Sequence, residues 1–328
     1  MRLAFWVSVV LSVLYSHGTD ACPDKCRCSK SSFCNGTNVN CYDRGLSGVP
    51  TNIPTDICDL YLSGNKIATL QTGNFDELTN LHTLSLWGND IAILPNGIFD
   101  VLTNLQFLHL WKNKIATLLN GIFDALTKLK KLGLQENELA TLPNGIFDAL
   151  TKLETLNLGR NKISTLKNGI FDALTKLEIL IVSGNEIAIL PTGLFDVLTN
   201  LQFLDLGRNK ISTLSNGIFD ELTKLKTLGL YENPLRCKCP LVDIIRTAKT
   251  RRLQLIDNPS CKNPVTLRKT FLKDLKLRDV VCDSDSITGT TGVETTVPGD
   301  QKRRYVNNCW FNNGAICCDL LFLERVRY

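Results

Sequence analysis

An asparagine recurs at every 24th residue through the middle of this 328-residue chain. Each one belongs to the pattern L-x-x-L-x-L-x-x-N-x-I/L, which the stretch 81–91 shows in full. The asparagines stand at Asn65, Asn89, Asn113, Asn137, Asn161, Asn185, Asn209 and Asn233. Because the step never changes, we expect eight equivalent coils that stack on one another, each contacting only its neighbours.

The repeat pattern predicts, in every coil, one short strand followed by a buried turn. In the second coil, a strand over 83–87 directs Leu84 and Leu86 inward, and the residues between them face outward. The turn that follows has buried backbone groups, and we expect the asparagine side chain to bond to them. The return half of each coil carries a phenylalanine at the same step, and these form a predicted second row of the core: Phe75, Phe99, Phe123, Phe147, Phe171, Phe195 and Phe219.

This pattern resembles the leucine-rich repeat. The resemblance implies an α/β solenoid, a leucine-rich-repeat horseshoe with a parallel concave β-sheet and disulfide-bonded N- and C-terminal caps. Eight strands spaced about 4.8 Å apart give a concave wall about 40 Å long. In a stacked architecture of this kind, such a wall is first of all a binding surface.

The cysteines cluster mainly at the two ends of the repeats, where an oxidising compartment would cross-link the open ends of a solenoid. Six cysteines at the N-terminal end allow fifteen pairings. We favour Cys22 with Cys28, Cys26 with Cys41 and Cys34 with Cys58. A zinc site is the alternative explanation of this cluster. The sequon Asn35-Gly36-Thr37 predicts a glycan on Asn35.

At the C-terminal end we expect pairs of Cys237 with Cys261 and of Cys239 with Cys282, around a helix predicted over 241–253. This cap is basic, which could attract anionic surfaces, although a solvated basic surface explains the charge as well. The cysteines left over in this scheme lie in the tail, and they indicate either a disulfide-linked homo-oligomer or free thiols: Cys309, Cys317 and Cys318.

Composition divides the chain into five segments. Residues 1–18 are predicted to be a signal peptide, because the apolar run 3–15 is shorter than the roughly 20 residues of a membrane-spanning helix. An N-terminal cysteine-rich cap (19–56), eight leucine-rich repeats (57–233) and a C-terminal cysteine-rich cap (234–282) follow. Residues 283–328 are a Ser/Thr-containing stalk and a cysteine-containing tail. We therefore expect an extracellular protein, secreted or associated with the cell surface.

The order of these segments, together with the signature G-x-F-D-x-L-T-x-L at 121–129 and 145–153, resembles a variable lymphocyte receptor, the repeat-built antigen receptor of jawless vertebrates. The resemblance covers residue 19 to about residue 297. It implies an immune-type antigen receptor. Two features depart from that family: the C-terminal cap has no long insert between Cys239 and Cys261, and the tail has no hydrophobic anchor. A receptor-like relative is compatible with both departures.

Two columns of outward-facing positions vary while the framework repeats. One column lies between the two strand leucines, and the other directly follows the second leucine. Drift at unconstrained surface positions would also produce such variation. From the two columns and one neighbouring position we predict the ligand-binding residues: Tyr61, Ser85, Trp87, Phe107, His109, Trp111, Gln135, Asn157 and Asp205.

The prediction depends most on Trp87 and Trp111, the two tryptophans within the repeats, which stand on adjacent strands. With Tyr61, Phe107 and His109 they form an aromatic patch suited to stacking on sugar faces or to binding a protein epitope. The alternative is that the two rings only pack on each other. The mixed charges of the later coils could add specificity or pair among themselves.

The sequence thus predicts an immune-type recognition receptor that binds a microbial surface glycan or protein antigen through its concave face. The alternative is a cell-surface or matrix adhesion protein that binds one self protein, and homodimerisation is a third possibility. We expect no enzyme, because His82 and His109 have no nucleophile partner in the sequence. We expect no cofactor, no metal and no nucleic acid, since the wall lacks a phosphate-binding loop and a basic stripe.

Overall fold

The computed structural model describes residues 22–32, 34–237, 241, 245 and 248–275, and the backbone of three short strands between 305 and 318. The chain forms two compact units, 1–281 and 282–328, which are described separately. The predicted signal peptide, most of the stalk and tail, and the expected Cys239–Cys282 pair lie outside the described residues.

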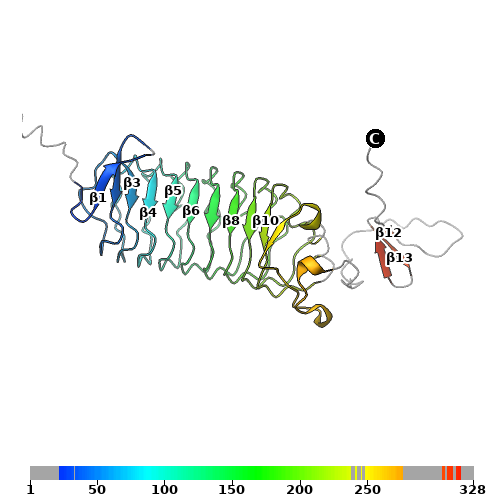
Figure 1. Cartoon of the computed structure of the whole chain (residues 1–328). Coiled ribbons are helices and arrows are strands. Elements are labelled where there is room, and N and C mark those ends of the chain that lie inside the picture. Colours follow the sequence, from blue (N-terminus) through cyan, green and yellow to red (C-terminus); the bar gives the residue numbers. More distant parts are fainter. Residues whose placement is uncertain are drawn as a thin grey trace, which may run out of the picture. The chain divides into compact units, whose positions relative to one another are not determined.

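The first unit is organised around one sheet whose strands follow one another in chain order (Figure 1). Pairing is parallel from β2 to β11, and only the β1–β2 pair is antiparallel. The strands are β1 (Arg27–Lys30), β2 (Thr37–Asn40), β3 (Ile57–Tyr61), β4 (Thr83–Ser85), β5 (Phe107–His109), β6 (Lys131–Gly133), β7 (Thr155–Asn157), β8 (Ile179–Ile181), β9 (Phe203–Asp205), β10 (Thr227–Gly229) and β11 (Gln254–Ile256).

Strands β3 to β10 come from the repeats, and their register is constant, since Leu60, Leu84 and Leu108 pair in line. The second coil's strand covers 83–85 rather than the predicted 83–87. The sheet is also longer than the repeats alone predict, because the N-terminal cap adds β1 and β2 and the C-terminal cap adds β11.

The core lies between the sheet and the return halves of the coils. Leu84 and Leu86 point inward and are fully buried, as predicted. The phenylalanines of the return halves are buried too, and neighbouring rings such as Phe147 and Phe171 stack with centroids 6.4 Å apart. Between residues 57 and 236 the return halves consist of turns, and no helix interrupts them. The fold is therefore a leucine-rich-repeat β-solenoid in which parallel strands stack coil upon coil.

The repeated asparagines form a continuous ladder of hydrogen bonds. Asn137, for example, donates from Nδ2 to the carbonyl oxygens of Leu110 and Leu134, both at 3.0 Å, and its Oδ1 accepts the N–H of Ile115 at 3.1 Å. All eight ladder asparagines are only 7–8% exposed. Each one therefore satisfies buried backbone groups of its own coil and of the coil before it.

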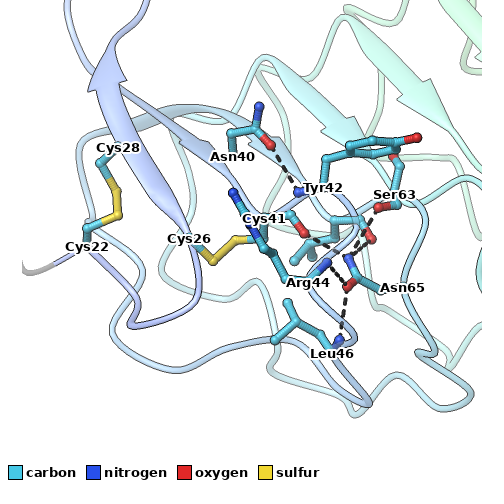
Figure 2. The surroundings of a disulfide bond; sticks show 11 residues. Cys22, Cys26, Cys28, Asn40, Cys41, Tyr42, Arg44, Leu46, Ser63 and Asn65 are labelled. Atoms are coloured by element: carbon cyan, nitrogen blue, oxygen red, sulfur yellow. Dashed lines mark hydrogen bonds between the residues drawn. A yellow bond between two sulfur atoms is a disulfide. The ribbon is translucent and has the colours of Figure 1, made fainter.

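The ladder also joins the N-terminal cap to the first coil. Asn65 Oδ1 accepts the N–H groups of Arg44 and Leu46, both at 2.9 Å, and its Nδ2 donates to the Cys41 carbonyl (Figure 2). Cys41 is itself disulfide-bonded to Cys26. The cap is thus held to the solenoid by the same hydrogen bonds that hold coil to coil.

Four disulfides occur among the described cysteines, and their partners are those of the favoured pairing: Cys22–Cys28, Cys26–Cys41, Cys34–Cys58 and Cys237–Cys261. Figure 2 shows the first two. In the C-terminal cap, residues 241, 245 and 248–250 are helical, and two short 3-10 helices follow, η1 (Val265–Leu267) and η2 (Leu272–Asp274).

The second unit contains a three-stranded antiparallel sheet made of β12 (Tyr305–Val306), β13 (Cys309–Asn312) and β14 (Ala315–Cys318). The three tail cysteines lie on β13 and β14. Across the described part of both units, no helix combines the length and apolar character needed to cross a bilayer.

The ladder generates a first prediction. Replacing Asn137 with Ala leaves the Ile115 N–H buried without its partner and removes one of two hydrogen bonds from each of the Leu110 and Leu134 carbonyls, which Asn113 and Asn161 still bond. The free energy of unfolding should therefore fall by about 3 kcal/mol. Urea unfolding followed by circular dichroism measures this loss. Asn144→Ala, which removes the same amide from an exposed turn, is the control and should change the free energy by less than about 0.5 kcal/mol. Equal effects of the two substitutions would contradict the role of the ladder.

Candidate ligand-binding face

The outward side of the sheet, here called the concave face, carries three columns of side chains. The first column precedes the strand leucine, the second lies between the two leucines, and the third follows the second leucine. Because successive strands pair in register, side chains of one column lie beside each other on neighbouring strands. The face is therefore a grid in which every position has a neighbour 24 residues away.

Three aromatic rings of the third column form what we call the aromatic strip: Tyr42, Trp87 and Trp111. The two indoles stack with centroids 4.2 Å apart and an angle of 3° between their planes. Tyr42 from the N-terminal cap meets Trp87 at 5.7 Å and 42°. Ser63 stands between Tyr42 and Trp87 in the column and is 1% exposed, so its small side chain lets the larger rings meet above it.

Beside the strip, the second column holds Tyr61, Ser85 and His109. The Ser85 hydroxyl lies 2.7 Å from that of Ser63, and Ser85 is 2% exposed, so it lies beneath the rings rather than at the surface. Tyr61 and His109 are half-buried. Burial, and secondarily the charge of Lys131, lowers the pKa of His109 below its ordinary value of 6.5. His109 is therefore neutral at physiological pH.

The first column contributes Phe107 and Lys131 to the same region. The Lys131 ammonium lies 5.8 Å from the centroid of the Phe107 ring, a cation–π distance. Earlier in this column, Asp59 is buried and its Oδ2 accepts the Ser31 hydroxyl at 2.6 Å. Burial and the Asp59 carboxylate raise the pKa of the Tyr61 hydroxyl, which therefore stays protonated. We call the face over β3 to β5 the aromatic half.

Gln135 stands at the border of the aromatic half, and Asn157 lies on β7, one strand further along. The amide oxygen of Gln135 is buried and has no hydrogen-bond partner in the described part of the chain. A methyl group on Gly133 would lie 3.2 Å from that oxygen and 3.4 Å from Cδ1 of Trp111. Asn157 Oδ1 accepts the Gly159 N–H at 3.0 Å, so part of its hydrogen-bonding capacity is used within its own coil.

The later coils satisfy their polar groups internally, and we call the face over β7 to β10 the polar half. Asp205 is buried, and its carboxylate accepts the Gly207 N–H at 3.0 Å and the Tyr231 hydroxyl at 3.3 Å. The Tyr231 ring occupies the space above Gly207, and the Asp205 carboxylate occupies the space above Gly229. Burial first, and then Asp205, raises the pKa of Tyr231.

Charged side chains of neighbouring later coils also form ion pairs with each other. Arg160 bonds to Glu136 at 3.2 Å and Arg208 bonds to Glu232 at 2.9 Å, each pair joining neighbouring coils. Arg208 also lies over the Tyr231 ring, 5.8 Å from its centroid. These charges of the later coils pair with each other, whereas Glu154 and Glu178 form no ion pair among the described residues, so both alternatives that the sequence left open still apply.

Six of the nine predicted ligand-binding residues therefore lie together on three adjacent strands or directly after them: Tyr61, Ser85, Trp87, Phe107, His109 and Trp111. Gln135 borders them, whereas Asn157 and Asp205 belong to later strands. Sequence reasoning missed Tyr42, which lies in the cap and outside the repeat. Tyr42 directly follows Cys41, which is buried and takes the place of a strand leucine in the sheet. That equivalence could have indicated that Tyr42 continues the third column.

One group of described side chains has the spacing of metal ligands. The sulfurs of Cys34 and Cys58 and a ring nitrogen of His82 lie within 4.8 Å of one another. His82 Nδ1 lies 2.7 Å from the Asn80 carbonyl oxygen. The two sulfurs, however, are joined as a disulfide, and a metal ion requires them as thiolates. This cluster therefore serves to bind the cap to the first coils.

Comparison with known proteins agrees with the repeat pattern. A leucine rich repeat family model matches residues 59–115, 79–139, 127–187 and 175–235, and together these stretches cover more than half of the chain. Leucine-rich repeat-containing protein 3B of Homo sapiens is 35% identical over 78 residues, which are 24% of this chain and 29% of that protein. The chain thus matches less than a third of the length of this curated relative.

Two solved structures share the fold. The crystal structure of human 5T4, a trophoblast glycoprotein, matches with a TM-score of 0.66 and 28% identity, covering 81% of this chain and all of that one. The structure of TLR13 with the RNA ssRNA13 matches with a TM-score of 0.54 and 34% identity, covering 60% of this chain and 27% of that one.

The half-buried imidazole of His109 generates a second prediction. Because the pKa of His109 is lowered in the folded protein, the unfolded chain binds a proton more readily at this residue, and folding stability should fall as the pH drops through about 6.5. Urea midpoints measured between about pH 7.5 and pH 5 should decline more steeply in the parent than in His109→Gln, in which every other titrating group remains. Parallel curves would contradict a neutral, half-buried His109.

The crossed pair Asp205–Tyr231 generates a third prediction. Gly207→Ala places a methyl group against the Tyr231 ring, and such overpacking should lower the free energy of unfolding by about 1–3 kcal/mol. In a Tyr231→Ala background the same substitution should cost much less, because the ring is gone. A double-mutant cycle by urea unfolding measures this coupling, and additive effects would contradict the contact.

Proposed function

The chain belongs to the leucine-rich-repeat family, and we propose that it is an extracellular recognition receptor of immune type. It binds a microbial surface glycan or protein antigen through its concave face. Solenoids of this family are typically binding scaffolds rather than enzymes, and disulfides at both ends are typical of extracellular and cell-surface proteins. The specific resemblance to a variable lymphocyte receptor is part of this proposal.

The aromatic half is the observation on which the proposal depends. Large rings from adjacent strands are only half-buried there, although the polar half shows that the same fold can cover its outward groups with one another. Clustered aromatic side chains at a protein surface are characteristic of binding sites, since they supply most of the binding free energy. Trp87 and Trp111 are the proposed anchors, with Tyr61, Phe107 and His109 beside them.

The segments beyond the repeats fit an exported receptor. We propose cleavage of a signal peptide at 1–18, caps over 19–56 and 234–282, and a stalk and tail over 283–328. Asn35 is exposed, which is compatible with a glycan there. In an oxidising compartment the tail cysteines would link chains into a homo-oligomer: Cys309, Cys317 and Cys318.

Similarity to 5T4 is equally compatible with a second candidate function, adhesion at the cell surface or in the matrix through one self protein. That likeness covers the whole of the 5T4 chain, whereas the TLR13 structure, which contains a bound RNA, is matched over only part of its length. Both candidates use the same face and differ in the ligand.

Binding of the secreted full chain to whole bacteria, isolated wall polysaccharides and a panel of cell-surface proteins tests the proposal. The Trp87→Ala, Trp111→Ala double variant should lose affinity by about 100-fold or more, because both anchors are removed. The control is Ile93→Ala, Ile189→Ala, which removes apolar side chains that are 71% and 73% exposed outside the strands.

Microbial binding that needs the two tryptophans supports the immune-type receptor. Binding to a single self protein that needs them supports adhesion instead. If the parent binds its ligand and the tryptophan variant, shown to be folded by circular dichroism, binds equally well, the site assignment is wrong.

A further inference from the structure

The orientation of the two indoles restricts what they can recognise. Trp87 and Trp111 follow adjacent strands, about 4.8 Å apart, and their parallel rings stack at 4.2 Å. The stacking direction therefore runs from strand to strand, along the solenoid. Rings stacked in this direction stand upright on the sheet, so that their edges point outward.

Three of the four indole faces meet another ring of the protein. Trp87 lies between Tyr42 on one side and Trp111 on the other. On the far side of Trp111 the next residue of the column is Gln135, whose amide oxygen is buried. A methyl group on Gly133 would lie 3.2 Å from that oxygen and 3.4 Å from Cδ1 of Trp111, so both side chains lie above Gly133. A sugar binds an aromatic residue by laying its C–H groups on the electron-rich face. That contact is closed at Trp87, which has a ring on either side, and narrowed at Trp111, where Trp87 covers one face and Gln135 stands beside the other.

Ring edges have the opposite preference. The edge of an indole is electropositive, so it packs against the face of another aromatic ring in a T-shaped contact or against an acceptor oxygen. The aromatic half therefore presents two parallel edges suited to the flat face of an incoming aromatic side chain. Tyr42, 49% exposed, borders these edges on the cap side.

Positive charge dominates beside the aromatic half, where three lysines stand against the carboxylate of Glu154, one coil beyond Lys130. Lys112 directly follows Trp111, and Lys130 and Lys131 stand on the next coil. Among the described residues, none of these three lysines forms an ion pair with a carboxylate. The nearby Glu136 is paired with Arg160, and Asp59 is buried. A ligand with negative charge around its central contact would match this surface.

Resting on the proposed function, we propose that the aromatic half binds an acidic protein segment. The segment sets the face of an aromatic side chain against the upright edges of Trp87 and Trp111, and its carboxylates lie near Lys112, Lys130 and Lys131. The ligand class is thus a protein antigen or protein partner and not a glycan stacked on the indoles.

Selection in two arms tests this inference with the full chain. One arm is a phage-displayed library of random peptides, and the other is an array of neutral and acidic glycans. We expect enriched peptides that combine Phe, Tyr or Trp with Asp and Glu, and no glycan binding that depends on the tryptophans. Affinity for a selected peptide should fall as the salt concentration rises.

Charge reversal provides a test that leaves the rings in place. Lys112→Glu, Lys131→Glu should weaken peptide binding by about tenfold or more, since both changes place a repelling charge beside the ligand. The matched control is Lys152→Glu, Lys176→Glu, which reverses two exposed lysines of the return halves and should leave binding unchanged.

The outcomes separate the two proposals. Glycan binding that is lost in Trp87→Ala, Trp111→Ala overturns the inference and leaves the recognition function standing. Enriched peptides without acidic and aromatic residues, or unaffected by the Lys112 and Lys131 changes, also overturn the inference alone. If neither arm yields a ligand that depends on the tryptophans, both proposals fail.

Discussion

The asparagine ladder is the interaction on which the rest of the structure depends. A solenoid buries one turn per coil, and a buried turn leaves backbone groups that water cannot reach. One amide side chain satisfies those groups in its own coil and in the coil before it, as Asn137 does. The ladder lies beneath the strand ends, so the side chains of the outward columns are not needed to bond these buried backbone groups. Those positions are therefore free to vary.

The two halves of the concave face use that freedom differently. In the polar half, Asp205 and Tyr231 cross over glycines and bond to each other, and charged residues of neighbouring coils pair. In the aromatic half the rings pack on one another but keep their edges open, and within the described part of the chain the lysines beside them form no ion pair with a carboxylate. The side chains of the polar half therefore contact mainly one another, whereas those of the aromatic half keep groups open to a ligand.

The constant period predicted the buried leucines, the phenylalanine row and the ladder, because each depends on position within one coil. It also placed Trp87 and Trp111 side by side. Their upright orientation could not be predicted, since it arises from packing against Tyr42 and Gln135. The burial of Ser85 was missed for a similar reason: its column points outward, yet neighbouring large side chains close over it. Tyr42 was missed because the cap departs from the repeat although its strand continues the sheet.

Ser63 beneath Tyr42 and Trp87 has a wider consequence. Tyr42 and Trp87 meet across it although one coil separates them, so the surface of a coil can depend on a residue two coils away as well as on its direct neighbours. Any coil of this solenoid can therefore replace another in the stacked framework, but the surface that it presents depends on the coils beside it. Exchanging one coil for another would keep the stack intact and yet rearrange the outward groups on both sides, so that a few modules in new orders generate more distinct surfaces than their number suggests.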